Sequence, residues 1–183
     1  MNKKALTEAD IRTKFITPAI DKDKQGSWDT MTQVLEEHYL TAGRVTVRGK
    51  SIHRGKAKKA DYLLFHKLNL PLAVIEAKDN KHALGHGMSQ VLEYAKVLDI
   101  PFAYSSNGYD FLEYDRTDLS DPVEREIPLD QFLSLEELWQ RYRCSKGYTD
   151  EQKEIATYDY YDDGSGKSPT PPPQTSPLRS SPN

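Results

Sequence analysis

The sequence predicts an α/β fold in which a mixed β-sheet is flanked by helices. Segments with helical periodicity alternate along the chain with short apolar segments rich in β-branched and aromatic residues. The 183 residues suffice for one domain of ordinary size, and 37% of them are hydrophobic, which is enough for a single core. A lone cysteine excludes an internal disulfide and a zinc site built from thiolates.

The first predicted element is a helix over residues 8–20, in which apolar side chains form one stripe. Thr7 and Asp10 resemble the capping arrangement that begins a helix, and Pro18 is expected to kink or shorten it. Residues 31–40 fit either a helix or an extended strand. Periodicity alone does not separate these two interpretations.

The middle of the chain is predicted to form the centre of the sheet. Charged and β-branched residues alternate over residues 44–48, which indicates a half-exposed strand. Two apolar runs, 60–65 and 71–78, are expected to pair as a β-hairpin. Apolar side chains at i, i+3 and i+4 then predict an amphipathic helix over residues 83–98 that crosses the sheet.

The remaining elements close the fold. Residues 102–106 are predicted to form a buried strand, and the Asn107-Gly108 turn leads to a further strand over residues 110–114. A short helix over residues 135–142 is expected to begin after Ser134 as its cap. We therefore expect a sheet of four or five strands.

Composition divides the chain into a domain over residues 1–160 and a tail over residues 161–183. Six of the last twenty residues are proline and five are serine, so we expect this tail to be disordered. The chain has neither an apolar signal segment at its start nor an apolar stretch long enough to span a bilayer. We therefore expect a cytoplasmic protein that does not associate with membranes.

The charges are unevenly distributed, although the formal net charge is only −3. Residues 44–59, here termed the basic run, contain seven Lys or Arg residues and no acidic residue. These residues are Arg44, Arg48, Lys50, Arg54, Lys56, Lys58 and Lys59. Such a run attracts a polyanion such as DNA, and the plain alternative is a solvated loop whose lysines serve solubility alone.

Three charged residues interrupt the apolar strands of the predicted hairpin. Asp61 begins one strand, and Glu76 and Lys78 end the other. Side chains alternate between faces along a strand, so Glu76 and Lys78 share a face and the hairpin can bring Asp61 beside them. Two neighbouring carboxylates repel unless a cation lies between them, and ligation by oxygen alone suits Mg²⁺.

This arrangement resembles the PD-(D/E)xK nuclease superfamily. Fourteen residues separate Asp61 from the Glu76-x-Lys78 motif, and Ala60 replaces the proline for which the superfamily is named. On the following helix, Gln90 and Tyr94 fit the Gln-x-x-x-Tyr element of the subgroup that includes RecB-like nucleases. The resemblance implies a restriction-endonuclease-like fold, which is an α/β mixed sheet flanked by helices.

The sequence further resembles the N-terminal nuclease domain of the restriction (motor) subunit of type I restriction enzymes. The stretches concerned are residues 7–12, 43–45, 59–64, 74–78 and 106–108. This resemblance implies a Mg²⁺-dependent endonuclease domain that cleaves duplex DNA in a complex with methylation and specificity subunits. The family's ATP-driven translocase is absent, so ATP is expected only for full-length members and this chain is expected to be a truncated product or a fragment.

The resemblance also implies roles for individual residues. Asp61 and Glu76 would hold Mg²⁺, and Lys78 would orient or activate the attacking water and offset charge in the transition state. Gln90 and Tyr94 would lie at the rim of the site and position Lys78 or DNA. Contacts from the basic run to the DNA backbone would carry no sequence information.

Two residues of the first helix leave alternatives open. Glu8 could complete the metal site, or it could be a carboxylate favoured in the first helical turn. Arg12 could form an i, i+4 ion pair with Glu8, or it could contact a phosphate. Neither pattern decides between the two roles.

Two other functions compete with the restriction nuclease. The domain could bind DNA or partner subunits without cutting, because cleavage in this family depends on assembly. It could instead be a stand-alone nuclease that uses the same fold and acts without ATP. Activity of the isolated chain with Mg²⁺ separates these alternatives.

Overall fold

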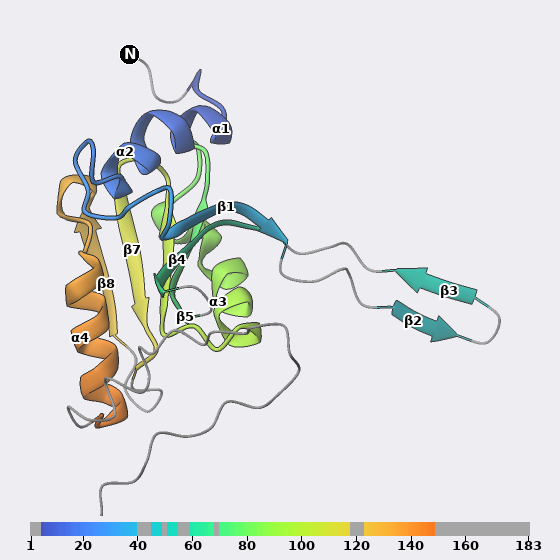
Figure 1. Ribbon diagram of the computed structural model, residues 1–183. Coiled ribbons are helices and arrows are strands. Elements are labelled where there is room, and N and C mark those ends of the chain that lie inside the picture. Colours follow the sequence, from blue (N-terminus) through green and yellow to red (C-terminus); the bar gives the residue numbers. More distant parts are fainter. Residues whose placement is uncertain are drawn as a thin grey trace, which may run out of the picture.

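A computed structural model describes residues 5–39, 45–48, 51–54, 59–67, 70–117 and 123–148 (Figure 1). Six strands in this part of the chain form one sheet in the spatial order β1-β4-β5-β6-β7-β8. Their bounds are Val34–Tyr39 (β1), Lys59–Lys67 (β4), Leu70–Ala77 (β5), Phe102–Ser106 (β6), Asp110–Asp115 (β7) and Val123–Pro128 (β8). Neighbouring strands are antiparallel except for β5 and β6, which run parallel. The predicted mixed sheet is therefore confirmed.

Helices cover both faces of this sheet (Figure 1). One face carries α3 (Met88–Val97), which supplies the crossover that the parallel pair β5 and β6 requires. The other face carries α4 (Leu135–Lys146) and an N-terminal helical segment. That segment consists of α1 (Glu8–Ile11), the π-helix η2 (Arg12–Ile16) and α2 (Thr17–Ile20).

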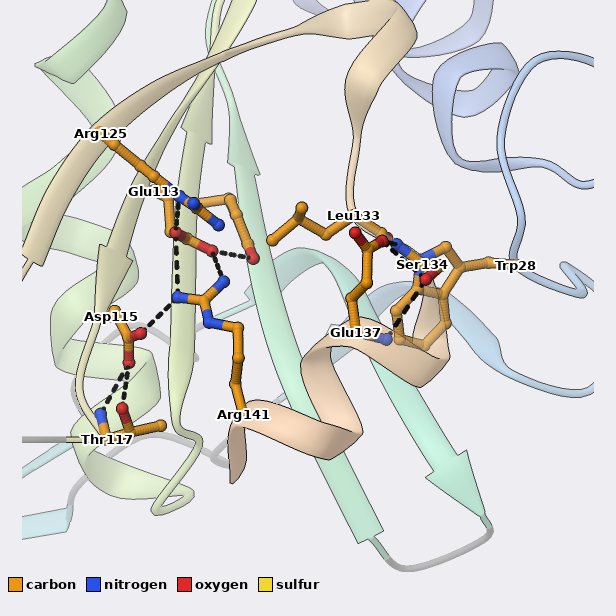
Figure 2. A network of polar contacts seen from close by, with 10 residues as sticks. Trp28, Glu113, Asp115, Thr117, Arg125, Leu133, Ser134, Glu137 and Arg141 are labelled. Carbon is orange, nitrogen blue, oxygen red and sulfur yellow. Dashed lines mark hydrogen bonds and ion pairs between the residues drawn. The ribbon is translucent and has the colours of Figure 1, made fainter. Parts of the chain in front are cut away.

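The core consists of two apolar clusters, one on each face. The cluster under α4 and the N-terminal helices includes Tyr62, Phe102 and Trp28. Trp28 also donates a hydrogen bond of 2.8 Å from its Nε1 atom to the carbonyl of Leu133, just before α4 (Figure 2). The smaller cluster packs beneath α3 and includes Val74 and Val91. The α3 face is the one that positions the predicted site.

The sheet has six strands, so the expectation of four or five strands was wrong. Residues 34–39 form strand β1 rather than a helix. Strand β8 was not predicted, because it is an edge strand in which only Ile127 is buried. One buried residue in six produces no period-two pattern in the sequence. The predicted hairpin of β4 and β5 and the predicted strands β6 and β7 are confirmed.

The predicted N-terminal helix forms over residues 8–20 with a local irregularity. Thr7 and Asp10 form a complete capping box, as expected. Pro18 has no N–H to donate and its ring would clash with the carbonyl four residues earlier. The chain adopts a π-helical turn immediately before it, where the Thr17 N–H donates to the carbonyl of Arg12.

The two other predicted helices differ from expectation at one end. Residues predicted to begin the crossover helix form the 3₁₀ helix η3 (Leu84–Gly87), and α3 starts at Met88. A further short 3₁₀ helix, η4 (Leu129–Gln131), precedes α4. Helix α4 begins after its Ser134 cap as predicted but extends beyond residue 142 to Lys146, where Gly147 ends it at φ 64°.

The strand predicted over residues 44–48 forms, but outside the main sheet. It is β2 (Val45–Arg48), which among the described residues pairs with β3 (Ser51–Arg54) in a separate two-stranded antiparallel sheet. The tail predicted over residues 161–183 lies outside the described residues, so its disorder stays a prediction. No helix in the described ranges is long and apolar enough to cross a membrane.

Candidate active site

The two predicted metal ligands lie opposite each other on β4 and β5. The strand register pairs Tyr62 with Ile75, and continuing it by one residue sets Asp61 opposite Glu76. Directly opposed residues of an antiparallel pair point to the same face of the sheet. Leu63, two residues after Asp61 along β4, packs in the cluster beneath α3. The structure therefore brings both carboxylates to the α3 face.

Glu76 is buried at the end of β5, with only 3% of its surface exposed. Its Oε1 atom accepts a hydrogen bond of 2.5 Å from Nζ of Lys78. Its Oε2 atom is also buried and has no hydrogen-bond partner among the described residues. Burial raises the pKa of Glu76 to about 7, although the contact with Lys78 opposes that rise.

Asp61 is held by two different groups. Its Oδ2 atom accepts a hydrogen bond of 2.8 Å from the backbone N–H of Ala77, and its Oδ1 atom lies 3.4 Å from Nη1 of Arg12. Burial raises the pKa of Asp61, against the lowering effects of the Ala77 N–H and of Arg12. These two contacts fix both oxygens of the carboxylate.

Lys78 links the carboxylates to helix α3. Besides its ion pair with Glu76, its Nζ atom lies 3.5 Å from Oε1 of Gln90. The Gln90 amide in turn donates a hydrogen bond of 2.6 Å to the hydroxyl of Tyr94. Burial favours the neutral amine, but the contact with Glu76 outweighs it and raises the pKa of Lys78, so the ammonium form persists. The predicted residues Asp61, Glu76, Lys78, Gln90 and Tyr94 thus converge.

Glu8 of α1 lies within electrostatic reach of this group. Desolvation and the nearby Asp61 raise the pKa of Glu8, and Lys78 opposes the rise. The suggestion that Arg12 pairs with Glu8 was wrong, because the ion pairs of Arg12 go to Glu36, Glu37 and Asp61. Arg12 therefore contacts residues that lie 24 to 49 positions away in the sequence, instead of a residue in its own helix.

Gly87 is a contributor that the sequence did not reveal. It ends η3 directly above β5 and β6, where a Cβ atom would lie 2.8 Å from Oγ of Ser105 and 3.1 Å from Cγ of Glu76. Only glycine therefore leaves room for the Glu76 side chain beneath the start of α3. A single sequence shows the glycine but does not show which distant residues pack against it.

Two protein carboxylates are too few for a metal site made of protein ligands alone. Within the described parts of the chain, no group of three or more His, Cys, Asp or Glu side chains gathers closely enough to hold an ion. Mg²⁺, however, commonly binds one or two carboxylates and completes its shell with waters and substrate phosphates. The unpartnered Oε2 atom of Glu76 and the opposed Asp61 fit that pattern.

The structure describes only part of the basic run. Arg44, Lys50, Lys56 and Lys58 lie outside the described residues. Arg48 pairs with Ser51 at one end of the β2–β3 hairpin, and Arg54 pairs with Val45 at the other. Lys59 begins β4 and forms an ion pair of 2.7 Å with Glu37. A DNA-binding role for these residues stays a prediction.

Known proteins resemble this chain well beyond the site residues. A family model described as the N terminus of the type I restriction enzyme R protein matches residues 33–121. The EcoAI endonuclease subunit of a type I restriction enzyme from Escherichia coli is 50% identical over 170 residues, which is 92% of this chain. Over residues 33–121 this chain is similar to the N terminus of type I restriction R proteins. The resemblance noted in the sequence is confirmed.

A solved structure agrees with this relationship. A fragment assigned as an HsdR subunit of a type I restriction enzyme from Vibrio vulnificus YJ016 matches 86% of this chain with a TM-score of 0.71 and 33% identity. The α/β fold class is thereby confirmed. The chain spans 21% of the length of the EcoAI subunit and 29% of the Vibrio chain. The catalytic roles of Asp61, Glu76 and Lys78 stay predictions.

Proposed function

We propose that this chain is a Mg²⁺-dependent nuclease domain that hydrolyses phosphodiester bonds of double-stranded DNA. The observation that carries the proposal is the buried Oε2 atom of Glu76, which lacks a hydrogen-bond partner among the described residues and lies opposite Asp61 and beside Lys78. A buried carboxylate oxygen without a partner is costly unless a ligand satisfies it. Mg²⁺ with its waters and a DNA phosphate would supply that ligand.

Asp61, Glu76 and Lys78 would have different roles in hydrolysis. Bound by Asp61 and Glu76, Mg²⁺ would lower the pKa of a water molecule and neutralise charge on the phosphate. Lys78, which stays protonated beside Glu76, would hold the attacking water or donate a hydrogen bond to a phosphate oxygen. The attacking water would give up a proton to the surrounding solvent and form a new bond to phosphorus as the bond to the leaving oxygen breaks. The leaving oxygen would take up a proton from solvent, and the ammonium would stabilise the added negative charge.

Gln90 and Tyr94 act on Lys78 rather than on the reacting atoms. Gln90 holds the lysine from α3, and Tyr94 holds the Gln90 amide one helical turn further on. A lysine has several rotatable bonds, so these contacts restrict where its ammonium group lies. Both residues are therefore supporting residues of the proposed site.

Substrate and partners follow from the relationship with restriction subunits. The basic run would bind the duplex backbone without reading its sequence. Recognition of a target would then belong to a specificity subunit, with methylation and specificity subunits as partners. The ATP-driven motor would belong to the part of such subunits that this chain does not span.

The proposal is tested by parallel measurements of Mg²⁺ binding by calorimetry and of plasmid cleavage on gels. Ca²⁺ serves as a cation that binds without supporting cleavage. We expect wild-type chain to bind Mg²⁺, Asp61→Asn to lose binding, and Lys78→Ala to keep binding. Glu126→Gln, which removes an exposed carboxylate from edge strand β8, is the matched control and should behave as wild type.

Cleavage by wild type but by neither site variant supports the nuclease and favours a stand-alone activity. Binding that requires Asp61 without cleavage supports the metal site but assigns the chain a role that depends on other subunits. The absence of Mg²⁺ binding, or binding unaffected by Asp61→Asn, contradicts the proposed site.

A further inference from the structure

We propose that Arg12 is a positioning residue for Asp61, and that Glu37, which has a positive φ angle in strand β1, holds Arg12 in place. This inference rests on the proposed function, because it concerns how one of the proposed Mg²⁺ ligands is oriented. It adds two residues from outside the β4–β5 hairpin to the architecture of the site. Neither belongs to the motif of Asp61 and Glu76-x-Lys78.

Arg12 reaches Asp61 from the N-terminal helical segment. Its Nη1 atom lies 3.4 Å from Oδ1 of Asp61 and donates a hydrogen bond of 2.7 Å to Oε1 of Glu37. The side chain is only 13% exposed, and its guanidinium carbon lies 5.4 Å from the centre of the Tyr62 ring. A guanidinium that is stacked and bonded in this way has little freedom to move.

The contact completes the restraint on the Asp61 carboxylate. The Ala77 N–H holds Oδ2, and Arg12 lies against Oδ1. A single hydrogen bond to one oxygen leaves a carboxylate able to rotate about that bond, whereas a second contact at the other oxygen fixes its plane. Partners of metal-ligating carboxylates commonly set ligand orientation, and removing them typically weakens metal binding.

Glu37 has an unusual backbone at the position that faces Asp61. The register pairs Glu36 with Tyr62 and His38 with Ala60, so Glu37 lies opposite Asp61. Its backbone φ angle is +54°, a value that residues other than glycine rarely adopt. Strain of this kind persists where the surroundings impose it, and it is often found at functional sites.

The Glu37 carboxylate forms ion pairs with two cations. Arg12 occupies Oε1, and Nζ of Lys59 occupies Oε2 at 2.7 Å. These contacts lower the pKa of Glu37 to about 2, so the carboxylate stays ionised. Since Lys59 is the last residue of the basic run, Glu37 connects the proposed DNA-binding segment with the proposed metal site.

The test measures Mg²⁺ affinity by calorimetry and thermal stability for the same variants. A purely electrostatic effect of Arg12 would oppose Mg²⁺, so Arg12→Gln would tighten binding. Positioning predicts the opposite sign, with binding weakened about tenfold. Lys14→Gln is the matched control, because it removes a cation from the same helical segment whose exposed ion pair goes to Asp10.

Glu37→Gly separates positioning from general stability. Glycine adopts the left-handed backbone without steric cost, and the ion pairs that this variant removes involve a half-exposed carboxylate, so the melting temperature should stay level or rise. Mg²⁺ binding should nevertheless weaken several-fold, because Arg12 no longer has the acceptor of its shortest hydrogen bond. A merely structural role would change stability and affinity together.

An Asp61→Asn variant distinguishes failure of this inference from failure of the proposed function. If Asp61→Asn leaves Mg²⁺ affinity unchanged, the proposed metal site itself is wrong. If Asp61→Asn abolishes binding while Arg12→Gln and Glu37→Gly bind Mg²⁺ as tightly as wild type or more tightly, only the positioning role is overturned. Weakening by both variants with intact folding supports it.

Discussion

At the scale of single residues, the burial of Glu76 makes stability depend on pH. Its pKa rises from an ordinary value of 4.5 to about 7 in the folded chain. Between these two values the folded chain keeps a proton that the unfolded chain has released, so stability falls as pH increases. This carboxyl contributes up to about 3 kcal/mol, which is fully present below pH 4.5 and lost above pH 7.

The prediction is checked by urea unfolding of metal-free protein from pH 4.5 to 8. We expect wild type to lose stability across this range relative to Glu76→Gln, in which the titrating group is absent. Asp61 titrates in both proteins, so the difference between the two curves isolates Glu76. Parallel curves would contradict the raised pKa.

Sequence reasoning identified those residues of the candidate site that follow from local pattern. Asp61, Glu76 and Lys78 are charged residues in otherwise apolar strands, and period two assigns them one face. Of the two roles left open for Arg12, the ion pair with Glu8 was wrong, and the contact with Asp61 was not foreseen because it spans 49 positions of sequence. Only the pairing of β1 with β4, which the sequence left open, brings Glu37 opposite Asp61.

At the scale of elements, the junction between η3 and α3 determines the space available to Glu76. Gly87→Ala would place a methyl group 2.8 Å from Oγ of Ser105 and 3.1 Å from Cγ of Glu76. We expect a loss of about 1–3 kcal/mol in unfolding free energy together with weaker Mg²⁺ binding, because the Glu76 side chain must shift.

Gly85→Ala is the matched control for this prediction. It lies in the same 3₁₀ helix, and its added methyl group would meet only Cδ2 of Leu112, at 3.2 Å. The terminal methyl group of a leucine can move more easily than Cγ of the buried Glu76 side chain. We therefore expect Gly85→Ala to leave Mg²⁺ affinity unchanged. Equal losses of Mg²⁺ affinity in the two variants would contradict the role of Gly87.

Helix α4 is attached to the sheet by a partly buried ionic network centred on Glu113 (Figure 2). Glu113 of β7 is fully buried and accepts hydrogen bonds from Tyr104, Arg125 and Arg141. Arg141 of α4 also bonds Asp115. Removing the Arg141 guanidinium leaves the Glu113 charge poorly compensated in the core, so Arg141→Met should cost about 3 kcal/mol of stability.

Urea unfolding of Arg141→Met and of a surface control on α4 tests the network. Gln140→Ala removes only an exposed contact with Glu136 and should change stability by less than about 0.5 kcal/mol. Since Glu113 and the proposed Mg²⁺ site lie on opposite faces of the sheet, Mg²⁺ affinity should not change. A loss below about 1 kcal/mol for Arg141→Met would show that the network contributes little.

Elements with strong periodicity were predicted, and elements without it were not. The β4–β5 hairpin and the capped start of α4 follow from local sequence. Strand β8 exposes most of its residues and therefore has no periodic pattern to detect. The late start of α3 reflects the close approach of Gly87 to β5 and β6, which is a tertiary contact.

At the scale of the whole molecule, binding of a DNA duplex should depend on the basic run. Replacing its seven Lys and Arg residues by Gln should weaken binding of a short duplex of arbitrary sequence, as measured by fluorescence anisotropy. The slope of log K against log salt should decrease by about 0.9 for each phosphate that the variant no longer neutralises. Lys22→Gln with Lys24→Gln, outside the run, is the control, and an unchanged slope in the sevenfold variant would contradict the role.

The most direct test of the central claim is a crystal structure of the chain soaked in Mn²⁺, a stand-in for Mg²⁺ that is visible by anomalous scattering. We predict an anomalous peak at about 2.2 Å from both Oε2 of Glu76 and an oxygen of Asp61, with waters completing the shell. Asp61→Asn crystals should lack that peak. A wild-type crystal at saturating Mn²⁺ with no peak between these two carboxylates would contradict the account.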